Sequence, residues 1–185
     1  MNGSYDGVSD IAFEKRGDRT VLTNRYRSGN SRISALIPTE DDIPLYFLVA
    51  TGGGFIEGEK YYNVATLERE AHAVLTTQTP NYIYKCPHGM TTSQLNEVVV
   101  KEDAFLEYYI DEVIPYEDAI YYQKTFVDIK KGGSLILTDG LTAGWSKSNT
   151  PFLYNRVDLK TKILYDNELV FNDYLIVNPE EEDMG

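Results

Sequence analysis

Three segments of this 185-residue chain share one pattern, and this internal repeat constrains the fold more than any other feature. Each segment contains a strand-like stretch, a charged turn, a small residue and a second strand-like stretch. The small residues are Ala71, Ala104 and Gly133, so the segments are offset by 33 and 29 positions. A repeat of this length is typical of one supersecondary unit that buries its apolar face by stacking on its neighbours. The three segments are YYNVATLEREAHAVLTTQ, SQLNEVVVKEDAFLEYYID and KTFVDIKKGGSLILTDG.

Apolar residues follow a period of two along most of the chain, which indicates strands rather than helices. β-branched and aromatic residues are crowded into short runs, and the 15 tyrosines suit half-buried strand surfaces. We therefore predict an all-β chain with little helix, of stacked β-hairpin or β-helix-like architecture or, alternatively, a sandwich. We expect one domain over residues 1–179 and an acidic tail over residues 180–185.

In-register stacking of the repeats predicts which side chains share a face. Two columns of small and apolar residues should line the core, because alternate residues of a strand point the same way. The opposite face mixes apolar residues with acids such as Glu107 and Asp111. It is either exposed or partly enclosed. The two core columns are Ala73 with Leu106 and Leu135, and Leu75 with Tyr108 and Leu137.

The charge balance excludes some classes of partner. The net charge is −12, and residues 61–185 carry 10 Lys or Arg against 20 Asp or Glu. Such a surface repels nucleic acid and anionic lipid and attracts cations and basic protein faces. No apolar run approaches the roughly 20 residues that span a bilayer. The chain has one cysteine and its first residues lack the pattern of a secretory signal, so we expect a cytoplasmic protein without membrane contact.

Four glycines within seven positions form the most unusual local stretch, TGGGFIEGEKYY at 51–62. A phosphate-binding loop would need a GK[ST] ending and a following helix, and the dinucleotide fingerprint needs a βαβ context; neither is present. The stretch therefore predicts a wide turn or bulge, in which glycine supplies backbone angles closed to other residues. The glycines are Gly52, Gly53, Gly54 and Gly58.

The stretch KCPHGM at 85–90 raises the question of a metal site. Cys86, His88 and Met90 offer sulfur and nitrogen at alternate positions. One cysteine and one histidine are too few ligands for a closed site, so metal binding here would need a second chain to complete the coordination. A simple Pro-Gly loop is the alternative.

Two rival functions fit an all-β chain. A glycosidase-like enzyme could use Glu107 and Asp139 as acid and base if they lay within about 10 Å of each other. A carbohydrate-binding module would instead carry a row of exposed aromatic side chains. The residue pattern alone does not distinguish between these two functions.

Several segments, in order, resemble the UreD family of urease accessory proteins, called UreH in some genera. They include YDG at 5–7, FEKRGDRTVL at 13–22, GGGFIEGEKY at 52–61, VLTTQTPNYIYK at 74–85, LILTDGLTAGWSKSNTPF at 135–152 and ELVFNDYLIVNP at 168–179. Some positions depart from the family pattern, such as Glu59 in place of the usual aspartate and Thr150 in place of glutamate. Family members are longer, so the resemblance implies a chain without their C-terminal third.

The resemblance implies a β-rich, non-enzymatic assembly factor without a permanent cofactor. Such a factor binds urease apoprotein and UreF and, through UreF, the GTPase UreG, and it helps deliver nickel to the urease active site. Nickel passage through the protein has been proposed for the family. A metal in transit must be attracted without being held, and oxygen donors bind nickel more weakly than imidazole or thiolate does. On this basis the candidate transit residues are Glu59, Glu107, Asp111 and Asp139, with Cys86 and His88 as further candidates.

Overall fold

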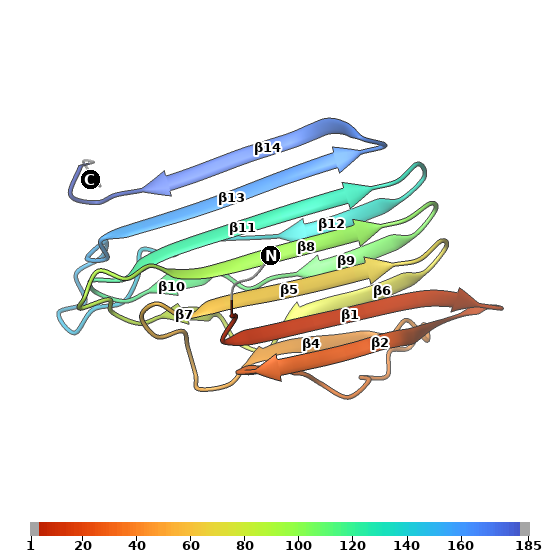
Figure 1. Cartoon of the computed structure of the whole chain (residues 1–185), viewed down its shortest axis with the longest axis horizontal. Coiled ribbons are helices and arrows are strands. Elements are labelled where there is room, and N and C mark those ends of the chain that lie inside the picture. The colour runs from red at the N-terminus through yellow and green to blue at the C-terminus, as the bar shows by residue number, and fades with distance from the viewer. Residues whose placement is uncertain (1–3, 182–185) are drawn as a thin grey trace.

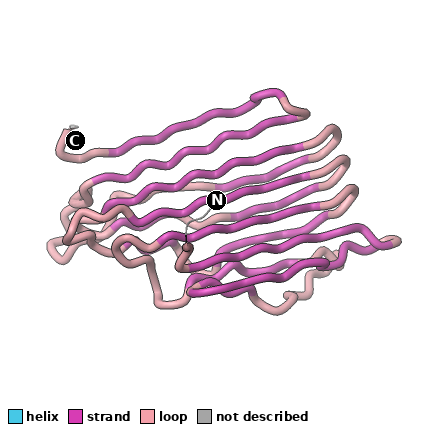
Figure 2. Tube along the Cα trace, in the orientation of Figure 1, coloured by secondary structure: helices cyan, strands magenta, loops and turns pink. Residues whose placement is uncertain are grey.

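The chain winds as a three-sided stack of β-coils. The computed structural model describes residues 4–181, which are 58% strand and contain no helix (Figures 1 and 2). A seven-stranded sheet has the order β14-β13-β11-β8-β5-β1-β2, a five-stranded sheet has the order β12-β9-β6-β4-β3, and β10 pairs with β7. The strands are β1 (Gly7–Arg16), β2 (Arg19–Gly29), β3 (Ser31–Ile33), β4 (Leu45–Ala50), β5 (Lys60–Leu67), β6 (His72–Thr77), β7 (Asn81–Ile83), β8 (Thr92–Val100), β9 (Phe105–Tyr109), β10 (Val113–Pro115), β11 (Ile120–Ile129), β12 (Ser134–Thr138), β13 (Arg156–Tyr165) and β14 (Glu168–Val177).

Successive coils stack in parallel, so the β-helix-like prediction is confirmed and the hairpin alternative applies only to the two ends. Parallel pairing joins β1 to β5, β5 to β8, β8 to β11 and β11 to β13 in the large sheet. The second sheet likewise pairs β4, β6, β9 and β12 in parallel. Antiparallel hairpins β1–β2 and β13–β14 flank the stack.

The predicted core columns are confirmed residue by residue. Leu106 pairs with Ala73 on one side and Leu135 on the other, which reproduces the offsets of 33 and 29 residues. Tyr108 pairs with Leu75 and Leu137 in the same way. The two leucines of β12 are only partly buried, because no further strand of this sheet follows β12 within residues 4–181. The apolar core is therefore well closed in the middle of the stack and open at its last coil.

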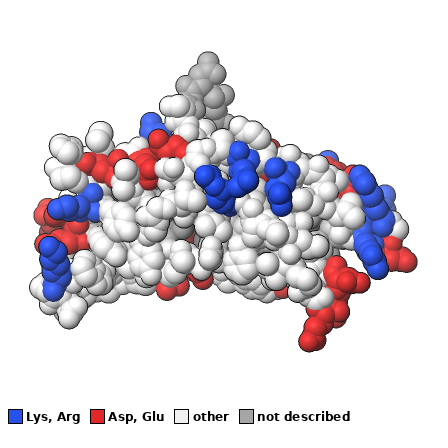
Figure 3. Space-filling view, turned by 90° about the horizontal axis from the view of Figure 1, so that it is seen from below, with Lys and Arg blue, Asp and Glu red and all other residues white. Residues whose placement is uncertain are grey.

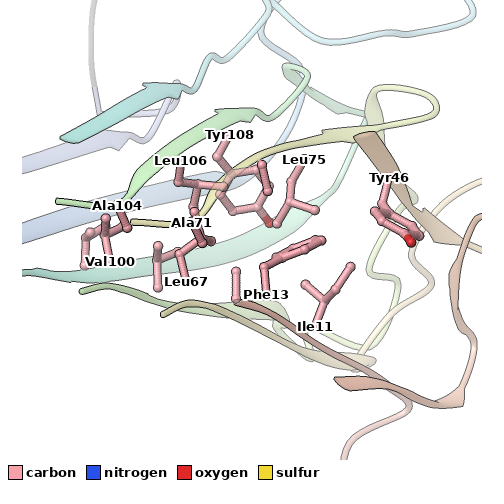
Figure 4. Packing of buried hydrophobic residues seen from close by; sticks show 14 of the residues in the cluster. Ile11, Phe13, Tyr46, Leu67, Ala71, Leu75, Val100, Ala104, Leu106 and Tyr108 are labelled. Atoms are coloured by element: carbon pink, nitrogen blue, oxygen red, sulfur yellow. The ribbon is translucent and has the colours of Figure 1, made fainter. Parts of the chain in front are cut away.

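Tight corners connect the large sheet to the second sheet. Ala71 and Ala104 are buried at these corners, and the strands stack there because Phe105 N–H donates to Ala71 O at 2.8 Å (Figure 4). The residue just before each small residue has a left-handed backbone, with φ of 60° at Glu70, 56° at Asp103 and 78° at Gly132. Glycine adopts this conformation without the strain that a side chain introduces.

The charges are not spread evenly over the end of the stack formed by β2 and β4. Figure 3 looks onto this end and shows a group of basic side chains near its middle, whereas basic and acidic side chains lie together toward both sides. Strand β2 carries Arg19, Arg25 and Arg27, and β3 carries Arg32. A basic area thus lies on a chain whose net charge is −12.

The sequence predicted an acidic tail at residues 180–185. Glu180 and Glu181 are exposed beyond the last strand, and residues 182–185 lie outside the described residues. No helix of residues 4–181 meets the length and apolarity that a membrane crossing requires.

Candidate functional site

A column of polar side chains runs through the interior of the stack. Asn63, Asn96 and Thr125 occupy paired positions on β5, β8 and β11, and Ser9 and Thr161 extend the column on either side. Asn63 Nδ2 donates to Asn96 Oδ1 at 3.0 Å, and Asn96 Nδ2 donates to Thr125 Oγ1 at 3.1 Å. Asn96 is completely buried. These bonds supply the partners that buried amides require.

A second polar column lies two residues earlier in the sequence of β8 and β11. Gln94 and Gln123 are paired and buried. Gln94 Nε2 donates to Asn96 Oδ1 at 3.0 Å, which joins the two columns. Gln123 Oε1 accepts from Tyr121 OH at 3.0 Å, and its Nε2 donates to Asp139 Oδ2 at 3.1 Å. The polar interior therefore ends at a carboxylate near the last coil.

The polar columns separate two apolar clusters. One cluster lies between the large and second sheets and contains Phe13, Leu67 and Leu106 (Figure 4). The other lies toward the third side and contains Phe55 and Tyr121. Because apolar groups close off both sides, the polar side chains between them form a polar strip along the axis of the stack.

Each end of the polar strip adjoins a cavity. A small cavity of about 30 Å³ at the first coils is lined by Ser9, Asn63, Asn81 and Gln94 among others. Among the described residues, Asn81 Nδ2 has no hydrogen-bond partner. This space suits about one water molecule, which could pair with that amide. At the last coil a groove of about 440 Å³ is lined by Asp139 together with Ile129, Leu135, Leu137, Thr161, Ile163, Val170, Phe171 and Asp173.

The electrostatics of Asp139 differ from those of an ordinary surface acid. Burial of the carboxyl raises its pKa, and the nearby charge of Asp173 raises it further. Hydrogen bonds from Gly140 N–H and Gln123 Nε2 oppose this shift without cancelling it. Asp139 nevertheless remains accessible from the groove. A carboxylate whose charge is poorly compensated attracts a cation, because a cation restores the lost stabilisation.

Glu107 points to the outside of the second sheet, where its two oxygens are occupied. Tyr109 OH donates to Glu107 Oε2 at 2.6 Å, and His72 Nε2 lies 2.9 Å from Oε1. The hydrogen bond from Tyr109, followed by that from His72, lowers the pKa of Glu107. The His72 ring also stacks on Phe105, with 4.6 Å between the ring centroids. Part of this mixed outer face is thus covered by its own side-chain network.

Glu59 and Asp111 have local structural contacts. Glu59 accepts hydrogen bonds from Asn30 Nδ2, Ile56 N–H and Tyr61 OH at 2.9, 3.0 and 3.0 Å, respectively, and thereby fastens the glycine-rich loop. Asp111 Oδ2 accepts from Thr77 Oγ1 at 2.9 Å. The two acids lie on different loops and do not meet Glu107 or Asp139 in one group of ligands.

The glycine-rich stretch forms a turn between β4 and β5. Positive φ angles occur at Gly52, Gly53 and Gly58. Gly54 has a different requirement, because a Cβ there would lie 2.8 Å from Tyr82 O and 2.9 Å from Tyr84 Cε2. The predicted turn is confirmed, and close packing against the next coil accounts for one of its glycines.

The structure separates Cys86 from His88. Cys86 is buried, and its Sγ accepts the Ile120 N–H at 3.3 Å. His88 is exposed and its Nδ1 lies 2.8 Å from Glu57 Oε2. Glu57 Oε1 accepts the N–H groups of His88 and Met90 at 2.7 and 3.0 Å. Within residues 4–181, no group of three or more His, Cys, Asp and Glu side chains is placed to hold a metal ion.

Glu107 and Asp139 do not converge as a catalytic pair would. Glu107 lies on the outer face of the second sheet with His72 and Tyr109, whereas Asp139 lies in the groove at the last coil and bonds to the buried Gln123. A glycosidase pair needs both carboxyl groups on one cleft, flanking one bond. This arrangement offers a polar interior with an acidic end instead of a two-carboxylate cleft.

Sequence reasoning missed the interior polar columns. A polar residue in a strand of period two is ordinarily assigned to the outside, because buried polar groups need partners. The signal was nevertheless present: Asn63, Asn96 and Thr125 have the same offsets of 33 and 29 residues as the core columns. Applying the repeat to polar positions would have placed them in one interior column.

The parallel stacking of coils around a hydrogen-bonded polar interior defines the class of this protein as an all-β solenoid. The profile of the family described as "UreD urease accessory protein" matches residues 5–185. The chain belongs to this family.

Individual relatives agree with this assignment. The chain is 44% identical over 184 residues to the urease accessory protein UreD of Streptococcus thermophilus (strain CNRZ 1066), covering 100% of the chain and 66% of that protein. It is 42% identical to UreD of Streptococcus salivarius (strain 57.I), again with 100% and 66% covered. UreD of Bacillus sp. (strain TB-90) is 31% identical over 179 residues, with 97% and 66% covered. The chain thus spans about two thirds of the length of these relatives, which are named as accessory proteins of urease rather than as enzymes.

Proposed function

We propose that the chain acts as a scaffold in the maturation of urease. In this role it binds urease apoprotein and UreF, contacts UreG through UreF, and helps deliver nickel to the urease active site in the cytoplasm. Membership in the UreD family is the observation that carries this proposal. The interlocked coils support it, because a rigid body is suited to holding several proteins in fixed positions.

We further propose that nickel, as cargo, moves along the polar interior and not over the outer face. The columns that contain Asn63, Asn96 and Gln123 present amide and hydroxyl oxygens, which bind nickel weakly. Asp139 supplies a negative charge at the last coil, where the groove opens. Weak donors at successive positions favour passage, because a tightly held ion would not leave.

The remaining acids and the Cys86–His88 loop have subordinate parts in this proposal. Glu59, Glu107 and Asp111 lie outside the polar columns and have hydrogen-bond partners of their own, so their role is to attract cations to the surface. His88 is exposed and could contribute one ligand to a site completed by a partner. Cys86 could join such a site only if the loop opened, because its sulfur is buried. The chain itself is assigned no catalytic residue and no resident cofactor.

The experiment has two readouts on the complex with UreF and urease apoprotein. Co-purification measures assembly, and nickel bound per urease measures delivery. We expect Asp139→Ala to keep assembly and lower nickel loading severalfold, whereas Asp41→Ala, the control at an exposed acid in the loop before β4, keeps both. Equal loading with Asp139→Ala would rule out the interior route. Failure of the unsubstituted chain to associate would defeat the scaffold proposal itself.

A separate titration addresses the Cys86–His88 loop. Nickel affinity is compared for the unsubstituted chain and for Cys86→Ala and His88→Ala, alone and with UreF present. Unchanged affinity in all cases would remove this loop from the proposal. Reduced affinity of His88→Ala only when UreF is present would support a site shared between two chains.

A further inference from the structure

A row of three aromatic side chains lies on the third side of the stack, away from the polar interior. Tyr84, Tyr116 and Trp145 come from three successive coils, and Tyr116 forms a parallel bridge with Trp145. The ring centroids are 5.1 Å apart between Tyr84 and Tyr116 and 4.7 Å apart between Tyr116 and Trp145. The rings thus follow the spacing of the coils, which is about 4.8 Å between neighbouring strands.

The three rings line a concave space with a volume of about 580 Å³. Trp145 remains 47% exposed, which leaves much of its indole available to a ligand. The other lining residues are charged. They are Lys85, Glu117, Asp118 and Lys147.

The orientation of the rings disfavours a flat ligand. Tyr84 and Tyr116 meet at 87°, and Tyr116 and Trp145 at 38°. A sugar chain stacks best on coplanar ring faces, whereas these rings pack against one another at angles and form one uneven wall of the concave space, which we call the aromatic box. A wall of this kind attracts cations, because the faces of aromatic rings carry negative charge density.

The walls of this aromatic box are held in place by the backbone. Tyr84 OH donates to Gly53 O at 3.1 Å, and Glu117 N–H donates to Trp145 O at 3.0 Å. Asp118 N–H donates to Leu153 O at 3.0 Å. A site that is already ordered before binding loses little conformational entropy when it takes a ligand.

The two carboxylates at the box are available for a cation. Neither Glu117 nor Asp118 uses its carboxylate in a hydrogen bond or ion pair with any other residue of 4–181. Both residues are exposed. A planar guanidinium can stack on a ring face and bind a carboxylate through two parallel hydrogen bonds, which an ammonium cannot do.

We propose that the box formed by Tyr84, Tyr116, Trp145, Glu117 and Asp118 binds an arginine side chain presented by an extended segment of a partner protein. The net charge of −12 favours the approach of such a basic segment. Lys85 and Lys147 at the rim oppose a cation, so binding depends on the rings and carboxylates together. This inference does not depend on a role in urease maturation, because it concerns the isolated chain and an arginine-bearing peptide.

Trp145 is the only tryptophan of the chain, so its fluorescence reports on this box alone. The probe is the peptide acetyl-Gly-Arg-Gly-amide, titrated into the purified chain, with the Lys and Gln peptides of the same design as comparisons. We expect saturable quenching by the Arg peptide with a Kd on the order of 1 mM. The Gln peptide should bind at least about tenfold more weakly. Equal responses to the Arg and Gln peptides would overturn the proposal, as would tighter binding of a cello-oligosaccharide.

Variants separate recognition from folding. Glu117→Gln with Asp118→Asn should weaken the Arg peptide by roughly threefold to thirtyfold, because two charge-assisted hydrogen bonds are lost. Lys147→Gln should instead tighten binding, because it removes a like charge. Both variants keep Trp145 as the reporter, and an unchanged emission maximum without peptide shows that the box is intact. Tighter Arg binding by the carboxylate variant, or weaker Arg binding by Lys147→Gln, would contradict a cation site.

Discussion

Asn63 donates a hydrogen bond to Asn96 across 3.0 Å, from one coil of the stack to the next. Asn96 also accepts from Gln94 and donates to Thr125, so one buried amide connects three coils. The interior of this solenoid is therefore held by specific polar pairs as well as by apolar packing. Such pairs fix which residues stand opposite each other, because a shifted register would leave buried amides without partners.

Replacement of Asn96 by alanine should destabilise the fold strongly. It leaves the amides of Asn63 and Gln94 without their acceptor and Thr125 without its donor. We expect the free energy of unfolding to fall by about 2–4 kcal/mol, as for buried groups that lose their partners. Urea denaturation measures this. The control is Ser93→Ala on the outer face of the same strand, which should change stability by less than about 0.5 kcal/mol. Equal losses of unfolding free energy in the two variants would contradict a stabilising role of the Asn96 hydrogen bonds.

The corners between the sheets predict opposite effects for two substitutions. Glu70 and Gly132 occupy equivalent corner positions with φ of 60° and 78°. Glu70→Gly should stabilise the chain or leave it unchanged, because glycine relieves backbone strain of about 1 kcal/mol. Gly132→Ala should destabilise it by about 1–3 kcal/mol, since it adds that strain and places a Cβ 2.1 Å from the Asp103 carboxylate. Thermal unfolding of both variants tests this pair, and a stabilised Gly132→Ala would contradict the corner geometry.

The network around Glu107 predicts a pH dependence of stability. Its hydrogen bonds with Tyr109 and His72 lower the pKa of Glu107 below its ordinary value of 4.5. The folded state therefore favours the ionised form, and this contribution is complete above pH about 4.5 and lost as the pH falls through the lower folded pKa. Glu107→Gln should cost about 1 kcal/mol at pH 7, and the difference from the unsubstituted chain should shrink toward pH 3. A difference that is constant over this range would show that Glu107 contributes no ionised contact.

The burial of Cys86 predicts that its thiol reacts slowly with thiol reagents. Its sulfur accepts the Ile120 N–H and the whole residue is only 3% exposed, so a thiol reagent cannot reach the sulfur in the folded chain. We expect negligible reaction with Ellman's reagent over minutes in buffer and complete reaction in 6 M guanidinium, on the order of the denaturant that unfolds stable domains. Glu57→Gln should speed the native reaction, because Glu57 fastens the neighbouring loop through His88 and Met90. Rapid reaction of the unsubstituted chain would mean that this loop opens readily.

The last coil predicts self-association. Among the described strands, none pairs with the free edge of β12, and Ile136 on β12 is 42% exposed. Strand β14, which lines the same groove, exposes Val170 and Phe171. Unpaired strand edges with apolar side chains pair with another copy. Light scattering should show a mass that rises with concentration, and Ile136→Lys should reduce it. Leu36→Lys, at an exposed apolar residue outside this coil, should not. A monomer at all concentrations would contradict the prediction.

The sequence predicted the stacked coils because three constraints coincide in the repeat. Apolar residues alternate at Ala73 and Leu75, a small residue follows each charged turn, and the offsets are the same for every column. The pairing of Leu106 with both Ala73 and Leu135 follows directly from these facts. The repeat could not show whether successive units form antiparallel hairpins or stack as parallel coils, because both arrangements have the same alternation of apolar and polar residues.

The contents of the site were harder to predict. The acids at Glu59 and Asp111 stood out as charges, yet each is occupied by local hydrogen bonds that depend on loop geometry. The inward direction of Asp139 follows from the alternation along β12, but its bond to Gln123 needs the register of two sheets. The aromatic box requires three residues that lie in loops and are offset by 32 and 29 positions, close to the offsets of the repeat. The alternation that reveals the repeat stops at the strand ends, so it does not extend to these residues.

The stacking of whole turns of chain sets a fixed step for this molecule. Each added or removed turn would change the separation between its two ends by about 4.8 Å and leave the remaining turns as they are. The number of turns therefore sets the distance between the arginine-rich end and the acidic groove. Partners bound at these two places would be held at a separation that changes only in steps of one turn.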